Sequence, residues 1–352
     1  MANLKLQNVT KKFGENIALD NIKLDVKEGE FISILGPSGC GKTTFLRSVA
    51  GFISPDEGEI AFGEETFFSH KNVVPVEERK LGMVFQHFAL WPHMTVREHL
   101  AYPLKSTSNK NRYQSDELKS LVAEAIQLVN LEEFEDRYPH QLSGGQKQRV
   151  ALARAIVAKP KLLLMDEPLS ALDASLKEMM IGEIKRIHRL TGATILYVTH
   201  DQSEAMSLSD RIIVMKKGNI EQIDTPHTIY NQPKTDFVAQ FVSKAMLVKG
   251  RWEENHFYPD KQTVYYWDGT HVDQSFKNNH IFPVRPDELE LRLEQQPIGT
   301  KGKIIDTQFL GKDMKVLVET ETSSITVVTG YSEALQVGRE VVVTHKRVNV
   351  AV

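Results

Sequence analysis

The sequence lacks the features that would mark a disulfide-stabilised, membrane-spanning or nucleic-acid-binding chain. It has a single cysteine, Cys40, so no disulfide can form within the chain, which fits a reducing compartment. No stretch approaches the ~20 apolar residues of a membrane-spanning helix, and the N-terminus has no long apolar signal-peptide core. The net charge of −3 gives no overall attraction to nucleic acid or anionic lipid. If the protein works at a membrane, another chain has to hold it there.

Length and composition point to an ordinary folded chain with two domains. Of its 352 residues, 41% are hydrophobic and 25% are charged. That length exceeds what one hydrophobic core usually organises. Short apolar runs alternate with helical spacing up to about residue 243, and short strands predominate beyond it. We therefore expect an α/β domain with a mainly parallel sheet over 1–243, with a helical subdomain at about 88–150. A small all-β, barrel-like domain should follow over 244–352.

One stretch carries a phosphate-binding pattern. Gly36, Gly41, Lys42 and Thr43 match G-x-x-x-x-G-K-[ST] between an apolar predicted strand and a predicted helix. Glycines let successive N–H groups turn toward phosphate oxygens, and the helix start adds partial positive charge. Lys42 can reach the outer phosphates, and the Thr43 hydroxyl can ligate Mg²⁺. We expect the whole loop to bind a nucleotide: Gly36, Pro37, Ser38, Gly39, Cys40, Gly41, Lys42, Thr43 and Thr44.

Polar side chains follow three apolar runs. Asp166 and Glu167 come directly after the run 162–165, and Gln86 and His200 each follow another predicted strand. Because the C-terminal ends of parallel strands meet at one sheet edge, these side chains should converge on the nucleotide. Asp166 and Gln86 would ligate Mg²⁺, Glu167 would polarise the attacking water, and His200 would bond a γ-phosphate oxygen. Taken singly, Gln86 and His200 are more often structural, so their assignment depends on the phosphate loop upstream.

A second glycine-containing segment precedes another predicted helix. Ser143, Gly144, Gly145 and Gln146 form either a second anion-binding helix start or an ordinary glycine turn. The chain has two such helix starts but only one phosphate loop. The economical arrangement is two chains facing head to tail, so that each segment completes the other chain's site.

In this order, the motifs resemble those of the ATP-binding subunits of ABC transporters, which have a P-loop NTPase core. The resemblance covers roughly residues 4–242. It rests on Gly36–Thr44 (Walker A), Gln86 (Q-loop), Leu142–Gln146 (signature), Leu162–Glu167 (Walker B), Ser170–Asp173 (D-loop) and His200 (switch histidine). Phe13 matches the family's adenine-stacking aromatic, although from pattern alone it is equally a surface aromatic of a hairpin.

The tail narrows the resemblance to bacterial importers. Segments 282–287 and 302–311 resemble the oligonucleotide-fold-like (TOBE-type) domain of ATPases that serve ferric iron, polyamine, sulfate, phosphonate or sugar uptake. The resemblance implies ATP and Mg²⁺, a homodimer, two integral membrane permease subunits docked near 88–94 and, indirectly, a substrate-binding protein. It implies a peripheral subunit at the cytoplasmic face of the inner membrane, with ferric iron or polyamine favoured as cargo.

The rival interpretation is a soluble ABC ATPase that acts on nucleic acid through its tail. Residues 241–352 contain 14 Lys and Arg against 15 Asp and Glu, so the tail has no basic excess. The sequence also lacks a second ATPase half and a long coiled-coil insert. We therefore expect no nucleic-acid partner.

Overall fold

The structure is a computed structural model that describes residues 2–105, 113–259, 265–293, 299–321 and 323–350. The chain divides into two compact units, Met1–Pro226 and His227–Val352. Helix α8 (Asp236–Phe241) lies in the second unit and contributes Ala239 to its core. The functional boundary at 243/244 stays a prediction, as does the subdomain at 88–150. Among the described residues, no helix is both long and apolar enough to cross a membrane.

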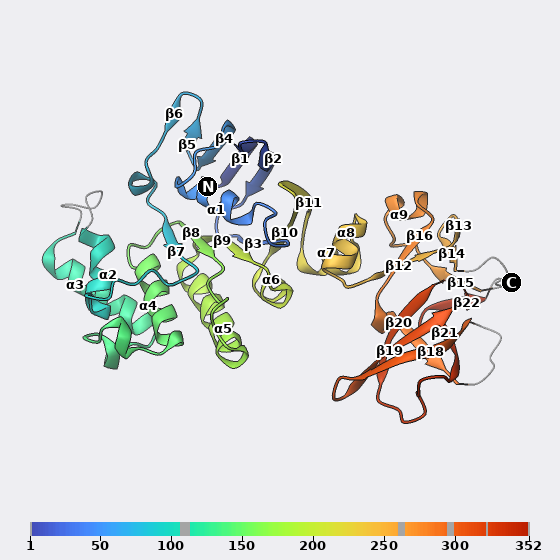
Figure 1. Cartoon of the computed structure of the whole chain (residues 1–352). Helices are drawn as coiled ribbons and strands as arrows, with labels where there is room; N and C mark the ends of the chain where they lie inside the picture. Colours follow the sequence, from blue (N-terminus) through green and yellow to red (C-terminus); the bar gives the residue numbers. More distant parts are fainter. Residues whose placement is uncertain (1, 106–112, 260–264, 294–298, 322, 351–352) are drawn as a thin grey trace. The chain divides into compact units, whose positions relative to one another are not determined.

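The centre of the first unit is a six-stranded sheet in the order β11-β10-β3-β9-β8-β7 (Figure 1). Its strands are β3 (Phe31–Leu35), β7 (Gly82–Val84), β8 (Leu162–Asp166), β9 (Thr194–Thr199), β10 (Arg211–Lys216) and β11 (Asn219–Asp224). All neighbours pair in parallel except β10 and β11, which form an antiparallel hairpin. The α/β core with a mainly parallel sheet is therefore confirmed.

Two hydrophobic cores lie on the two faces of this sheet, because successive strand residues point to opposite faces. Leu164 and Leu196 belong to one core, together with Phe45 of helix α1 (Lys42–Ala50). Leu163 and Tyr197 belong to the other, together with residues of the helices. This double burial explains why the central strands are continuous apolar runs.

Helices of the first unit pack on the sheet, and some of them also contact one another. They are α1 (Lys42–Ala50), α2 (Val96–Lys105), α3 (Ser115–Leu128), α4 (Gly144–Ile156), α5 (Ala174–Thr191) and α6 (Gln202–Leu208). Helices α2, α3 and α4 contact one another and lie together at one end of the unit (Figure 1).

A second, antiparallel sheet packs on the α1 side in the order β2-β1-β4-β5-β6. Its strands are β1 (Leu4–Phe13), β2 (Asn16–Val26), β4 (Glu57–Phe62), β5 (Glu65–Ser69) and β6 (Asn72–Val73). Helix α1 contacts β2, β8 and β9, so it lies between the two sheets.

In its described residues, the second unit contains α7 (Pro226–Asn231, whose first residue ends the first unit), α8, α9 (Gln274–Asn278) and three sheets. The smaller sheets are β12-β16 and β13-β14-β15-β22, with β12 (Met246–Lys249), β13 (Arg251–Glu253), β14 (His256–Tyr258), β15 (Tyr265–Asp268), β16 (Ile281–Val284) and β22 (Val348–Val350). The largest is β17-β21-β18-β19-β20, with β17 (Leu289–Arg292), β18 (Thr300–Phe309), β19 (Asp313–Thr320), β20 (Ser324–Gly330) and β21 (Glu340–His345). Its edge strands β17 and β20 contact each other, which nearly closes an antiparallel barrel and confirms the predicted fold.

A buried arginine supports the C-terminal end of α1. Arg79 is 3% exposed and donates to the carbonyls of Ser48 and Val49 in the last turn of α1, at 3.0 and 2.7 Å. It also donates to the carbonyls of Phe67 and Val74. Burial lowers the pKa of Arg79 to about 10, so the group stays cationic at neutral pH. A cation at a helix C-terminus stabilises the helix.

Replacing this guanidinium should destabilise the first unit. We expect Arg79→Met to lower the free energy of unfolding by about 3 kcal/mol, because four buried carbonyls lose a charged donor. Urea denaturation followed by circular dichroism measures the effect. The control is Arg97→Met, which removes a partly exposed ion pair to Glu135 and should change the free energy by no more than about 0.5 kcal/mol. Equal midpoints for the two variants would contradict the supporting role of Arg79.

Candidate functional site

The phosphate-binding segment is the turn between β3 and α1. Gly41 is the N-cap of α1 and has φ +107°, and a Cβ there would collide with the carbonyl oxygen of Ala18. Among the described residues, no side chain caps the first turn of α1, and that turn contains no acidic residue. The N–H groups at the start of α1 and the helix dipole therefore favour an anion at this position.

Lys42 lies against its own loop. Its Nζ donates to the carbonyl oxygens of Gly36 at 2.8 Å and Pro37 at 3.0 Å, and the side chain is buried. Ser38 and Gly39 are exposed at the tip of the loop, while Thr44 is half buried in the first turn of α1. The Lys42 ammonium group is thus held by carbonyl oxygens of the loop that precedes α1.

Cys40 faces inward rather than toward solvent. Its side chain is 3% exposed and belongs to the core around α1. Burial raises the pKa of the Cys40 thiol, although the charge of Lys42 partly opposes this shift. The Cys40 side chain therefore packs between the loop and the core around α1.

A hydroxyl and a carboxylate from two elements meet beside the loop. Thr43 Oγ1 donates to Asp166 Oδ1 at 3.2 Å, and Arg47 lies 3.8 Å from the other carboxylate oxygen. Burial raises the pKa of Asp166, and the hydrogen bond from Thr43 and the charge of Arg47 lower it in part. A buried carboxylate next to a hydroxyl is the oxygen donor set that Mg²⁺ prefers.

Glu167 contacts two other strand-end residues. Its Oε2 accepts from Gln86 Nε2 at 3.4 Å and lies 3.1 Å from His200 Nδ1. Strands β7, β8 and β9 are neighbours in the sheet, so the residues that follow them come together. Glu167 has φ +44°, a sparsely populated conformation for a non-glycine residue. The structure thus brings together Gln86, Glu167 and His200, and separately Thr43 and Asp166.

A buried polar network fixes the backbone around His200, and the sequence analysis missed it. Glu204 accepts from the hydroxyls of Tyr197 and Thr199, both at 2.7 Å, and pairs with Lys177 at 2.8 Å. Asp201 caps α6 and also pairs with Lys177. Burial would raise the pKa of Asp201, but Ser203 and Lys177 lower it to about 2. Asp201 before an apolar-periodic segment was an available N-cap signal.

The segment Ser143–Gln146 begins helix α4 with a capping box. Ser143 Oγ accepts from the Gln146 N–H at 3.3 Å, and Gln146 Oε1 accepts from the Ser143 N–H at 2.8 Å. Gly145 packs closely on α5, since a Cβ there would lie 2.7 Å from a Leu176 methyl group and the leucine side chain would have to move. Ser143 and Gly144 are exposed, and among the described residues no hydrogen bond or ion pair joins this segment to the phosphate loop.

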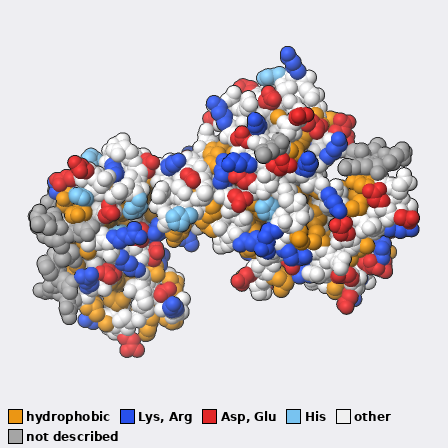
Figure 2. Space-filling view, turned by 180° about the vertical axis from the view of Figure 1, so that it is seen from behind, with side chains coloured by type: hydrophobic (Ala, Val, Ile, Leu, Met, Phe, Trp, Pro, Cys, Tyr) orange, Lys and Arg blue, Asp and Glu red, His pale blue; other side chains and the backbone are white. Residues whose placement is uncertain are grey.

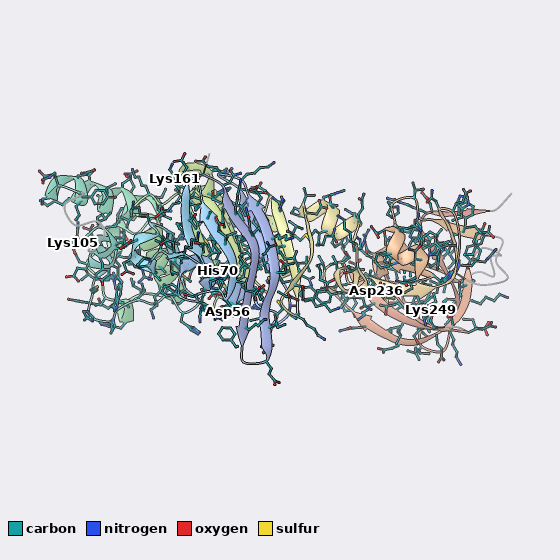
Figure 3. All side chains as sticks on the ribbon, turned by 90° about the horizontal axis from the view of Figure 1, so that it is seen from above. Asp56, His70, Lys105, Lys161, Asp236 and Lys249 are labelled. Carbon is teal, nitrogen blue, oxygen red and sulfur yellow. The ribbon has the colours of Figure 1, made fainter. Side chains whose placement is uncertain are left out.

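Phe13 ends β1 and is half exposed. The Lys11 Nζ lies 5.3 Å from its ring centroid. Asp56, labelled in Figure 3, pairs with Lys11 at 2.9 Å and accepts from the Lys12 N–H at 2.6 Å. These contacts fix the end of the strand and leave the ring accessible for stacking.

A groove of about 600 Å³ adjoins the segment that follows Gln86. Ala89 and Trp91 line it together with Tyr102 of α2 and Arg154 of α4. The Trp91 N–H donates to His99 Nε2 at 2.8 Å, which fixes the segment to α2. The groove therefore has an aromatic wall held by the helical group.

Comparison with known proteins identifies relatives of this chain. The sequence profile of the ABC transporter family matches residues 19–170. The spermidine/putrescine import ATP-binding protein PotA of Marinobacter nauticus is 42% identical over 90% of this chain and 84% of its own length. The Fe(3+) ions import ATP-binding protein FbpC of Fusobacterium nucleatum subsp. nucleatum is 41% identical over 91% of this chain and 84% of its own.

A solved structure also resembles this chain in its fold. The dimeric ATP-binding cassette MJ0796 with bound ADP and Pi is 36% identical, with a TM-score of 0.55 over 63% of this chain and 98% of its own length. The chain belongs to the ABC transporter family, among the ATP-binding proteins of its importers. The expected class, an ATPase that drives import, is thereby confirmed.

The burial of Cys40 gives a test of the loop geometry. We expect Cys40 to react with a maleimide at pH 7.5 at least about tenfold more slowly than a cysteine placed two residues earlier, because the thiolate is the reactive form. The comparison chain is Cys40→Ser/Ser38→Cys, whose thiol occupies an exposed position. Mass spectrometry of labelled protein gives both rates. Equal rates would contradict the inward orientation of Cys40.

Proposed function

We propose that the chain hydrolyses ATP as a head-to-tail homodimer and that hydrolysis drives uptake through two permease subunits. The observation that carries the proposal is the position of Glu167. Its carboxylate lies between Gln86 and His200, directly after the Asp166–Thr43 pair. Gln86, Glu167 and His200 thus meet at neighbouring strand ends, and Asp166, the residue before Glu167, contacts Thr43 at the end of the phosphate loop.

The donor set beside the loop fits Mg²⁺. Thr43, Asp166 and Gln86 supply a hydroxyl, a carboxylate and an amide oxygen, which are hard oxygen ligands. When bound, Mg²⁺ neutralises charge on the β- and γ-phosphates. Lys42 and the N–H groups of α1 orient the phosphates from the other side.

Glu167 and His200 act on the attacking water and the γ-phosphate. The Glu167 carboxylate accepts a proton from the water, and the Gln86 amide holds that water in line. The His200 imidazole donates to a γ-phosphate oxygen. Phe13 stacks on the adenine, a role that its exposure permits.

The second helix start completes the site of a partner chain. Ser143 and Gly144 are exposed at the N-terminus of α4, and their backbone groups are available to a γ-phosphate presented by another copy. The dimeric state of the similar cassette MJ0796 supports this arrangement. ATP would close the dimer and hydrolysis would open it.

The groove beside 88–94 is the proposed docking site for the permeases. Its wall is aromatic and half exposed, as expected for a surface that receives a helix from another protein. Docking there would place the chain at the cytoplasmic face of the inner membrane as a peripheral subunit. A substrate-binding protein would connect to it only through the permeases.

Polyamine or ferric iron is the proposed cargo, because relatives with both names match nearly the whole chain. To identify the cargo, uptake of labelled putrescine and uptake of labelled Fe³⁺ are measured in cells that lack this chain. Restoration of one uptake by the chain, but not by its Glu167→Gln variant, identifies the cargo. Sulfate, phosphonate and sugar uptake are the alternatives.

Nucleic acid is not a proposed partner. Acidic and basic side chains are interleaved over the visible face of the second unit (Figure 2), consistent with 14 Lys and Arg against 15 Asp and Glu in residues 241–352. A nucleic-acid-binding barrel would need a basic surface.

Substitutions of the adjacent acids Asp166 and Glu167 should affect nucleotide binding and hydrolysis differently. We expect Glu167→Gln to bind ATP but to hydrolyse it at least about 10² times more slowly, because it loses a general base. It should also accumulate as an ATP-dependent dimer in size-exclusion chromatography. Asp166→Asn should weaken Mg²⁺-dependent nucleotide binding as well as turnover. Near-normal hydrolysis by Glu167→Gln would refute the catalytic assignment.

The groove can be tested without touching the catalytic residues. Tyr102 is 49% exposed in the groove, so Tyr102→Glu should abolish co-purification with the permease subunits while the chain's own ATPase rate changes less than about twofold. Leu190→Glu is the matched control, because Leu190 is 63% exposed and does not line this groove. Permeases retained equally by both variants would exclude the groove as the docking site.

A further inference from the structure

Helix α4 carries residues of interest at both of its ends. Its N-terminus carries Ser143 and Gly144, while Arg154 lies eleven residues after Ser143, about 16 Å along the axis. Arg154 is 8% exposed. Among the described residues, no ion pair links it to a carboxylate.

The guanidinium of Arg154 binds two successive backbone carbonyls outside its own helix. Nη2 donates to the Phe88 oxygen at 2.8 Å, and Nη1 donates to the Ala89 oxygen. The same group lies 5.3 Å from the ring centroid of Trp91. A planar fork suits two neighbouring acceptors, so a point charge such as lysine could not reproduce the contact.

These two carbonyls belong to a strained turn. Phe88 has φ +61° and Ala89 has φ +48°, so two consecutive non-glycine residues are left-handed. The turn also contains hydrogen bonds from the Phe88 N–H to the Phe85 oxygen and from the Ala89 N–H to the His87 oxygen. Such a conformation persists only where surrounding contacts hold it. Arg154 supplies two of those contacts.

Gln86 lies near the start of this turn, whose hydrogen bonds run from Phe85 to Ala89. Arg154 therefore holds the chain two and three residues after the side chain that contacts Glu167 at 3.4 Å. Ala89, Trp91 and Arg154 also line the same groove. Arg154 thus lies on the helix that begins with the signature segment, contacts the turn that follows Gln86, and lines the groove.

We propose that Arg154 is a positioning residue that sets the place of Gln86 relative to Glu167 and transmits movements of α4 to that contact. The inference rests on the proposed hydrolytic role of Glu167 and Gln86. A displacement of α4, when its N-terminus meets a partner's nucleotide, would pull the Phe88–Ala89 turn. Occupation of the groove would act on the same turn from the other side.

A double-mutant cycle on the purified full-length chain tests this role. We expect Arg154→Met to lower kcat about tenfold and to change the KM for ATP less than about threefold, because it acts after nucleotide binding. In a Gln86→Ala chain, the same substitution should lower kcat by less than about twofold, because the residue through which it acts is gone. Arg154→Lys should recover only part of the lost rate.

The control removes a similar contact elsewhere in the same unit. Arg186 of α5 donates to the backbone oxygen of Leu128, which follows no catalytic residue, so Arg186→Met should leave kcat within about twofold in both backgrounds. Denaturation midpoints verify that each variant is folded. If Arg154→Met does not fold, Arg154→Lys is used in the cycle instead, and a drop in kcat that disappears with Gln86→Ala remains the expected result.

Two outcomes would overturn the inference. One is additivity, in which Arg154 and Gln86 substitutions multiply their separate effects on kcat. The other is an equal loss of kcat in the Arg154→Met and Arg186→Met chains. Failure of the proposed function is distinguishable, because it would appear as an active Glu167→Gln chain. An inactive Glu167→Gln chain with additive Arg154 and Gln86 effects would overturn only the role of Arg154.

Discussion

The parallel pairing of β3, β9, β8 and β7 is the constraint on which the site depends. Four short strands that are buried on both faces can end at one edge only if helices or long connections return the chain to the opposite edge. The phosphate loop follows β3, and the residues after β7, β8 and β9 are then adjacent by register alone. Glu167 meets Gln86 and His200 because their strands are neighbours, although the residues are far apart in sequence.

Much of the first unit could be predicted because its strongest signals are local. The glycine-rich turn before a helix, the continuous apolar strands and the acids after 162–165 each have one physical explanation at short range. The resemblance then indicated a P-loop NTPase core. The inward orientation of Cys40 could not be predicted, since both neighbours are glycine and the packing that buries it comes from the core around α1.

Other features depended on contacts that no local pattern records. Arg79 and Arg154 look like ordinary surface cations in sequence, yet both are buried against backbone carbonyls of segments distant along the chain. The Glu204 network joins α5, β9 and α6 through hydroxyls and one lysine. In the second unit, the strands between residues 246 and 292 are only three or four residues long, which is too short for a clear period of two.

The contacts of Lys42 affect how tightly a nucleotide can bind. In this conformation the ammonium group already has two acceptors, the carbonyl oxygens of Gly36 and Pro37. Since the ammonium group has three N–H bonds, a phosphate oxygen accepts from the third or replaces one of these carbonyls, so the measured affinity depends on the hydrogen bonds that Lys42 already makes. The same contacts keep the loop folded and its cation satisfied before any ligand arrives, which lowers the ordering entropy lost on binding. An anion therefore binds to a cation that the loop already holds in place.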